Sequence, residues 1–101
     1  MLITSWTDVR EPGEYSSGHI PTSNNMPIKS APDGIFLPAD EFEEKFGFAK
    51  PKQEQEVVFY CRSGVRSSAA AQLAQQAGYG TIGEYRGSWL DWEGKGGEVE
   101  R

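Results

Sequence analysis

Apolar and polar positions change over short distances along this chain, so the sequence predicts several short strands and helices. The clearest strand covers residues 57–60, an apolar Val-Val-Phe-Tyr run typical of a strand buried on both faces. The clearest helix covers residues 67–77, because alanines and Leu73 recur at three- and four-residue spacing and Gly78 follows. Weaker patterns predict strands over 2–9, 25–28 and 80–85, and helical turns over 11–17, 38–46 and 89–92.

The alternation of helices and strands predicts one α/β domain over residues 1–101, with a mostly parallel central sheet flanked by helices. Residues 94–101 are rich in glycine and charge, and we expect them to form a loose tail.

The strand predicted over residues 2–9 has an unusual composition. Ser5 and Thr7 stand where a buried parallel strand usually has Val, Ile or Leu.

Composition narrows the classes of function. A net charge of −5 argues against a nucleic-acid partner, and the chain has no apolar run of the about 20 residues that cross a membrane. One cysteine forbids an internal disulfide, and one cysteine with one histidine cannot build a common zinc site. No secretory signal precedes the first polar residues, so we expect a cytoplasmic protein, or a mitochondrial one if a presequence was removed.

The single cysteine lies in a short polar loop between the clearest strand and the clearest helix. The loop and the start of the helix comprise Cys61, Arg62, Ser63, Gly64, Val65, Arg66 and Ser67. Gly64 allows a tight turn in which successive amides point inward, and Ser67 suits the N-cap of the following helix. These amides, the helix dipole and two arginines all favour a thiolate, the form that attacks. A cysteine that only fills the core is the alternative, but it has no need of guanidinium neighbours.

Other segments carry a family resemblance. They are Asp8-Val9-Arg10-Glu11-Pro12 with Glu14-Tyr15, Gly18-His19-Ile20-Pro21 with Asn25 and Pro27, and Gly87-Ser88-Trp89 with Asp91-Trp92. Together with the cysteine loop, they make the chain resemble single-domain rhodaneses, which are sulfurtransferases, and small fungal members most of all. Members of this family normally begin with a further strand and helix, which we expect to be missing here.

The resemblance implies a mechanism and a set of roles. Cys61 would take a sulfur atom from a small anionic donor such as thiosulfate, and pass it from a persulfide to a thiol, to cyanide or to a protein sulfur acceptor. Arg62 or Arg66 would pair with the donor oxygens, and the loop amides would hold the persulfide. Asp8 and Arg10 would be structural support near this loop. The family needs no metal and no organic cofactor.

Three alternatives stay open. Phosphatases and arsenate reductases of the same fold have five residues between cysteine and arginine, whereas four residues separate Cys61 from Arg66 here, and Ser67 at the next position cannot replace a guanidinium. A persulfide-relay module would share the chemistry and differ in its partner. A non-catalytic interaction module is the third alternative, and the intact cysteine loop argues against it.

Overall fold

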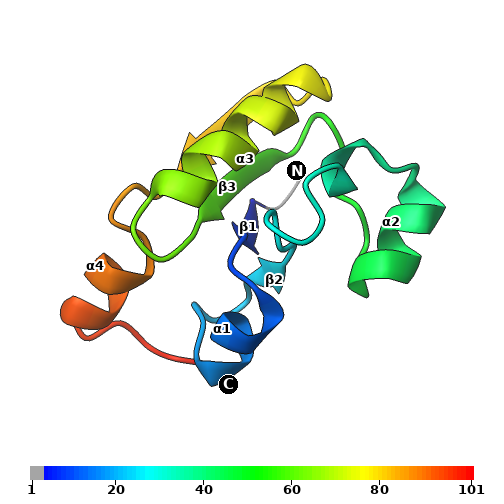
Figure 1. Cartoon of the computed structure of the whole chain (residues 1–101). Helices are drawn as coiled ribbons and strands as arrows, with labels where there is room; N and C mark the ends of the chain where they lie inside the picture. The colour runs from blue at the N-terminus through cyan, green and yellow to red at the C-terminus, as the bar shows by residue number, and fades with distance from the viewer. Residues whose placement is uncertain (1–3) are drawn as a thin grey trace.

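A parallel sheet of four strands forms the centre of the protein, in the order β2-β1-β3-β4 (Figure 1). The structure is a computed structural model and describes residues 4–101. Every strand pair is parallel, as the predicted α/β class requires. In chain order the elements are β1 (Ser5–Asp8), α1 (Pro12–Ser17), β2 (Asn24–Asn25), a 3₁₀ turn (Gly34–Phe36), α2 (Ala39–Phe46), β3 (Glu56–Tyr60), α3 (Val65–Gln76), β4 (Thr81–Glu84) and α4 (Ser88–Gly94).

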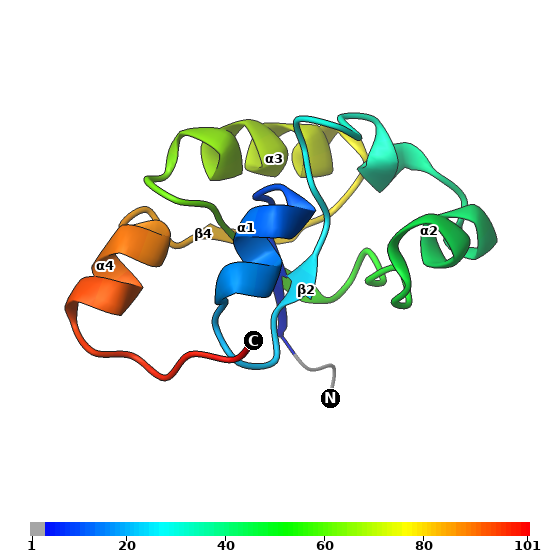
Figure 2. The same cartoon turned by 60° about the horizontal axis from the view of Figure 1, so that its bottom comes forward.

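The two faces of the sheet carry different clusters because side chains alternate along β3. Val57 and Phe59 point into the larger cluster beneath α3, which approaches closely through buried alanines such as Ala74. Tyr60 points into a smaller cluster on the other face, where it meets Trp89 of α4. Figure 2 shows α3 and α4 apart on these two sides. No helix among residues 4–101 is long and apolar enough to span a bilayer.

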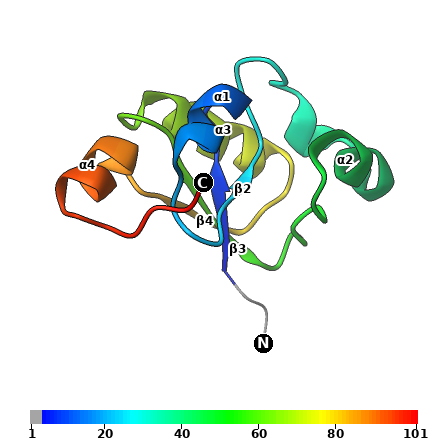
Figure 3. The same ribbon diagram turned by 90° about the horizontal axis from the view of Figure 1, so that it is seen from below.

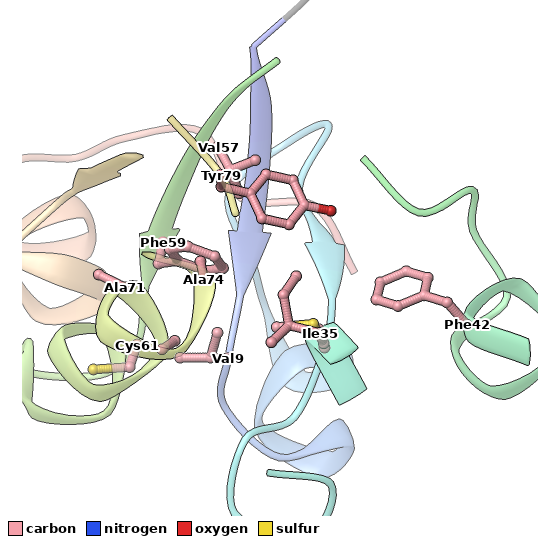
Figure 4. Close-up of a cluster of buried hydrophobic side chains, with 11 residues drawn as sticks. Val9, Ile35, Phe42, Val57, Phe59, Cys61, Ala71, Ala74 and Tyr79 are labelled. Atoms are coloured by element: carbon pink, nitrogen blue, oxygen red, sulfur yellow. The ribbon is translucent and has the colours of Figure 1, made fainter. Parts of the chain in front are cut away.

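The larger cluster also fixes the position of the cysteine. Cys61 follows β3 directly, is 1% exposed, and continues the alternation that places Val57 and Phe59 under α3. Figure 4 shows it at the end of the cluster away from Val57 and Tyr79, with its sulfur directed away from Val9. The cysteine sulfur is therefore held by the core at one end of the central strand.

The C-terminal segment differs from the loose tail that composition predicts. It returns across the molecule to α1 (Figure 3), where His19 and Glu100 exchange backbone hydrogen bonds of 2.9 and 3.0 Å. The Trp92 indole donates to the Glu98 carbonyl at 2.7 Å, and Val99 packs in the smaller cluster. Backbone hydrogen bonds, Val99 and side chains such as the Trp92 indole hold this segment, and a composition rich in glycine and charge does not reveal such contacts.

The weaker sequence patterns match shorter elements. The strand predicted over 2–9 is β1, and residues 2 and 3 of that prediction lie outside the described residues. The strand predicted over 25–28 is the two-residue β2, but the chain continues beside β1, because the amides of Met26 and Ile28 donate to the carbonyls of Asp8 and Val9.

Thr7 gives a test of the packing in β1. It is 2% exposed, and its hydroxyl has no hydrogen-bond partner among the described residues. Thr7→Val removes an unsatisfied group at nearly constant shape, so we expect it to raise the free energy of unfolding in urea by about 1 kcal/mol. Thr7→Ser keeps the hydroxyl and loses a methyl group, so it should lower that free energy by about 1 kcal/mol. Destabilisation by Thr7→Val would mean that the hydroxyl is satisfied.

Candidate active site

Cys61 lies at the carboxyl edge of the sheet, where parallel α/β proteins place their ligands. The chain leaves β3, turns at Gly64 and enters α3 at Val65. Gly64 has a φ of 102° and is the N-cap residue of α3. The predicted N-cap at Ser67 is therefore wrong. The left-handed glycine starts the helix two residues earlier than the alanine spacing suggests, and Ser67 lies inside the first turn.

Three hydrogen-bonding groups surround the sulfur. The amide of Gly64 lies 3.0 Å from the Sγ atom, and the hydroxyls of Ser67 and Ser88 lie 3.6 and 3.9 Å from it. Burial by itself raises the pKa of the Cys61 thiol. The Ser67 hydroxyl and the amides of residues 63, 64 and 67 outweigh burial, and the net pKa lies below the ordinary value. The cysteine is buried, yet its surroundings favour the thiolate.

The carbonyl groups of the same loop are held by the first turn of α4. The amide of Trp89 donates to the Cys61 carbonyl at 2.9 Å, and the amide of Leu90 donates to the Arg62 carbonyl at 3.1 Å. The amide of Cys61 donates to the Ser88 hydroxyl at 3.1 Å. Ser88 is fully buried and takes a φ of 54°, which is rare for a residue with a side chain. Sequence reasoning noted Gly87-Ser88-Trp89 only as a family motif and missed this role.

The two loop arginines have different surroundings. Arg66 forms an ion pair with Glu14 of α1 at 2.7 Å. The exposed Arg62 side chain makes no hydrogen bond or ion pair with any residue from 4 to 101 and lines a groove of about 400 Å³ beside the loop. Ser63 and Val65 are also exposed. Of the two arginines predicted to meet the donor, Arg62 is the one whose guanidinium is available.

The groove has a mixed charge. Its lining includes Arg62 and Arg101 together with Glu14 and Glu93, and it is completed by Arg10, Gly13, Ser17, Gly18 and Trp89. Arg101 is supplied by the C-terminal segment, where its Nε atom donates to the Ser17 carbonyl at 3.2 Å. The sequence did not predict Arg101 as a site residue, because residues 94–101 were expected to form a loose tail.

Asp8 and Arg10 form a buried ion pair between β1 and the groove. The Arg10 Nη2 atom donates to the Asp8 carboxylate at 2.7 Å and to the Gly18 carbonyl at 2.7 Å. The Arg10 guanidinium carbon lies 4.7 Å from the centroid of the Trp89 ring. Since the Trp89 amide holds the Cys61 carbonyl, the pair reaches the loop through one intermediate residue. This geometry supports the predicted structural role of the pair, which stays a prediction.

His19 lies away from the sulfur, in the turn after α1. Its ring stacks on Tyr15, with centroids 3.7 Å apart, and its Nδ1 atom lies 2.8 Å from the Tyr15 carbonyl oxygen. Its Nε2 atom lies 3.2 Å from the Glu100 carboxylate. A structural role in the turn accounts for all of these contacts.

A parallel α/β sheet with a thiolate-stabilising loop at its carboxyl edge is an arrangement in which a cysteine can act as a nucleophile. The chain belongs to the rhodanese-like domain family, whose model matches residues 2–95. This confirms the resemblance seen in the sequence.

Comparisons with individual proteins give the same family. The chain is 46% identical over 91 residues to the thiosulfate:glutathione sulfurtransferase of Saccharomyces cerevisiae, covering 90% of this chain and 66% of that protein. It is 46% identical over 90 residues to the mitochondrial thiosulfate sulfurtransferase RDL2 of the same yeast, covering 89% and 60%. The crystal structure of RDL2 matches with a TM-score of 0.87 at 43% identity, over 92% of this chain and 76% of that one. The chain thus spans less than two thirds of these curated relatives.

The Ser67 hydroxyl gives a test of thiolate stabilisation. Ser67→Ala removes a donor to the charged form, so we expect the thiol pKa to rise by about one unit and alkylation at neutral pH to slow. The measurement is the rate of reaction with iodoacetamide against pH. Ser63→Ala is the matched control, because residue 63 acts through its backbone amide and should keep the thiol pKa unchanged. Equal shifts in both variants would contradict the role given to the Ser67 hydroxyl.

Gly64 gives a test of the turn itself. A Cβ atom at this position would lie 2.5 Å from the carbonyl oxygen of Arg86 and would force a side chain onto a left-handed backbone. We expect Gly64→Ala to cost about 1–3 kcal/mol in urea unfolding and to slow thiol alkylation. Gly47→Ala is the control, because Gly47 also has a positive φ but has open space around it. Alkylation of Gly64→Ala at the wild-type rate would show that the turn does not set thiol reactivity.

Proposed function

We propose that the chain is a thiosulfate-type sulfurtransferase that works through a persulfide on Cys61. The Cys61 thiolate attacks the outer sulfur of thiosulfate, forms a sulfur–sulfur bond, and releases sulfite as the old bond breaks. An acceptor thiolate or cyanide then attacks the outer sulfur of the persulfide and regenerates the Cys61 thiolate. The charges balance in each step, no outside oxidant or reductant is consumed, and the kinetics should be of the ping-pong type.

The observation that carries this proposal is the set of donors on the Cys61 sulfur. The amide of Gly64 donates to the sulfur, and the hydroxyl of Ser67 would donate to it once the thiol has lost its proton, so both would stabilise negative charge before attack and in the persulfide anion. A cysteine that served only to fill the core would not collect such donors. Arg62 supplies a free guanidinium to the groove, where its fork matches the oxygens of thiosulfate and sulfite.

The acceptor and the location are finer points of the proposal. The groove carries both signs of charge, which suits a thiol that itself bears ammonium and carboxylate groups, such as glutathione. The name of one yeast relative, thiosulfate:glutathione sulfurtransferase, supports this choice. We propose a mitochondrial rather than a cytoplasmic location, on the support of the name of RDL2. A protein acceptor would make the same loop a persulfide relay.

The test is the intact mass of the protein after incubation with thiosulfate. We expect Cys61 to gain the mass of one sulfur atom, and cyanide or glutathione to remove it with release of thiocyanate or a glutathione persulfide. Cys61→Ser is the control and should gain nothing. An unchanged mass, with hydrolysis of an aryl phosphate by the same sample, would instead support the phosphatase alternative.

A further inference from the structure

Glu14 and Arg66 join two elements that lie far apart in the sequence. The Arg66 Nη1 atom donates to the Glu14 Oε1 atom at 2.7 Å, and the Nη2 atom donates to Oε2 at 3.1 Å. This is the two-pronged geometry in which a guanidinium binds a carboxylate most firmly. The same fork would fit the oxygens of an anionic sulfur donor, so Glu14 and the donor compete for one partner.

Glu14 is itself held in place by α1. Its Oε1 atom accepts a hydrogen bond from the amide of Glu11 at 3.1 Å, as part of the capping box that begins this helix. The hydrogen bonds from Arg66 lower the pKa of Glu14 to about 2, so the carboxylate stays charged at any physiological pH. The acceptor of Arg66 is therefore a fixed, permanently ionised group.

Arg66 lies within electrostatic reach of the reactive sulfur. Its hydrogen bonds to Glu14 raise the pKa of Arg66, and the negative charge of the Cys61 thiolate adds to the same shift. The groove beside the loop is lined by Glu14 and Arg62, and Arg66 is not among its lining residues. Of the two members of the ion pair, it is therefore Glu14, and not Arg66, that lines the groove.

We propose that Glu14 is a positioning residue that reserves the Arg66 guanidinium in an ion pair and leaves Arg62 as the arginine that contacts the anionic donor. This inference rests on the proposed function for the identity of the donor. Its physical content is that Glu14 limits the positive charge available to the Cys61 sulfur and to the donor oxygens. A pair that served only as a brace between α1 and α3 would have no such effect.

Glu14→Gln distinguishes these two roles, because they predict opposite changes in the thiol pKa and in the KM for thiosulfate. Glutamine can still accept the Glu11 amide, so α1 keeps its capping box. If the pair reserves Arg66, its release favours the thiolate, and the apparent thiol pKa from iodoacetamide alkylation falls by about half a unit. The KM for thiosulfate falls about two- to fivefold, within the range of a partly exposed ion pair. If the pair is only a brace, the loop loosens and both the thiol pKa and the KM rise, which would overturn the proposal.

Glu93→Gln is the matched control for charge alone. Glu93 lines the same groove and forms no ion pair within the described residues, so its neutral variant should shift the thiol pKa less than Glu14→Gln does. Likewise, Glu14→Gln introduced into Arg66→Gln should have no more effect than Glu93→Gln. Equal shifts from Glu14→Gln and Glu93→Gln in the wild-type background would reduce Glu14 to a general negative charge and overturn its specific role.

Arg62→Gln completes the test. If Arg62 contacts the donor, the KM for thiosulfate should rise about tenfold or more, whereas the alkylation rate by the uncharged reagent should change little. An unchanged KM would overturn the assignment of Arg62. If the wild-type protein formed no persulfide at all, the proposed function would fail, but the alkylation profile would still decide whether Glu14 controls the charge at Cys61. Should Glu14→Gln fold poorly, Glu14→Asp, one methylene shorter, would be used to release the fork.

Discussion

The rest of the site depends on how the peptide groups of the cysteine loop are oriented, with an amide toward the sulfur and carbonyls toward α4. The amide of Gly64 points at the Cys61 sulfur, while the carbonyls of Cys61 and Arg62 point at the amides of α4. A peptide plane is rigid, so fixing its carbonyl also fixes the direction of the neighbouring amide. By holding the Arg62 carbonyl, the first turn of α4 therefore orients the amide of Ser63, one of the amides that lower the thiol pKa, although α4 contributes no backbone amide to the sulfur among the described residues. Preorganised donors of this kind cost no rearrangement when charge develops.

This constraint explains why residues without chemistry of their own lie at the site. Ser88 accepts the Cys61 amide through its hydroxyl and takes a left-handed backbone, so α4 begins where its amides can meet the loop. Trp89 is held against the Arg10 guanidinium, which is held in turn by the buried Asp8 carboxylate. The chain of contacts runs from β1 through α4 to the cysteine, and each member is buried enough to be rigid.

The sequence predicted the class of fold and the position of the cysteine at the end of a central strand because both depend on local patterns. An apolar run before Cys61 and spaced alanines after it place the cysteine at the end of a central strand, and Gly64 indicates the turn. What it missed depends on partners distant in sequence. The Glu14–Arg66 pair spans 52 positions, and the Arg101 side chain reaches the groove only because residues near His19 hold the returning segment. The misplaced N-cap at Ser67 has a local cause, since a left-handed glycine can begin a helix without a serine.

The distribution of basic residues follows from the same site. The chain carries a net charge of −5, yet four of its five arginine side chains line the groove beside the cysteine loop or pair with a carboxylate that lines it. Three line the groove, Arg66 pairs with a carboxylate that lines it, and the carbonyl of Arg86 lies beside Gly64. An acidic surface elsewhere would oppose the approach of a dianion, so the proposed donor would depend on a local positive potential from the unpaired guanidinium groups beside the loop. Guanidinium groups suit this purpose because their forks fit oxyanions, and because one of them can be neutralised selectively by a carboxylate placed in the fork. The strength of that potential is therefore set by how many arginines remain unpaired as well as by how many are present.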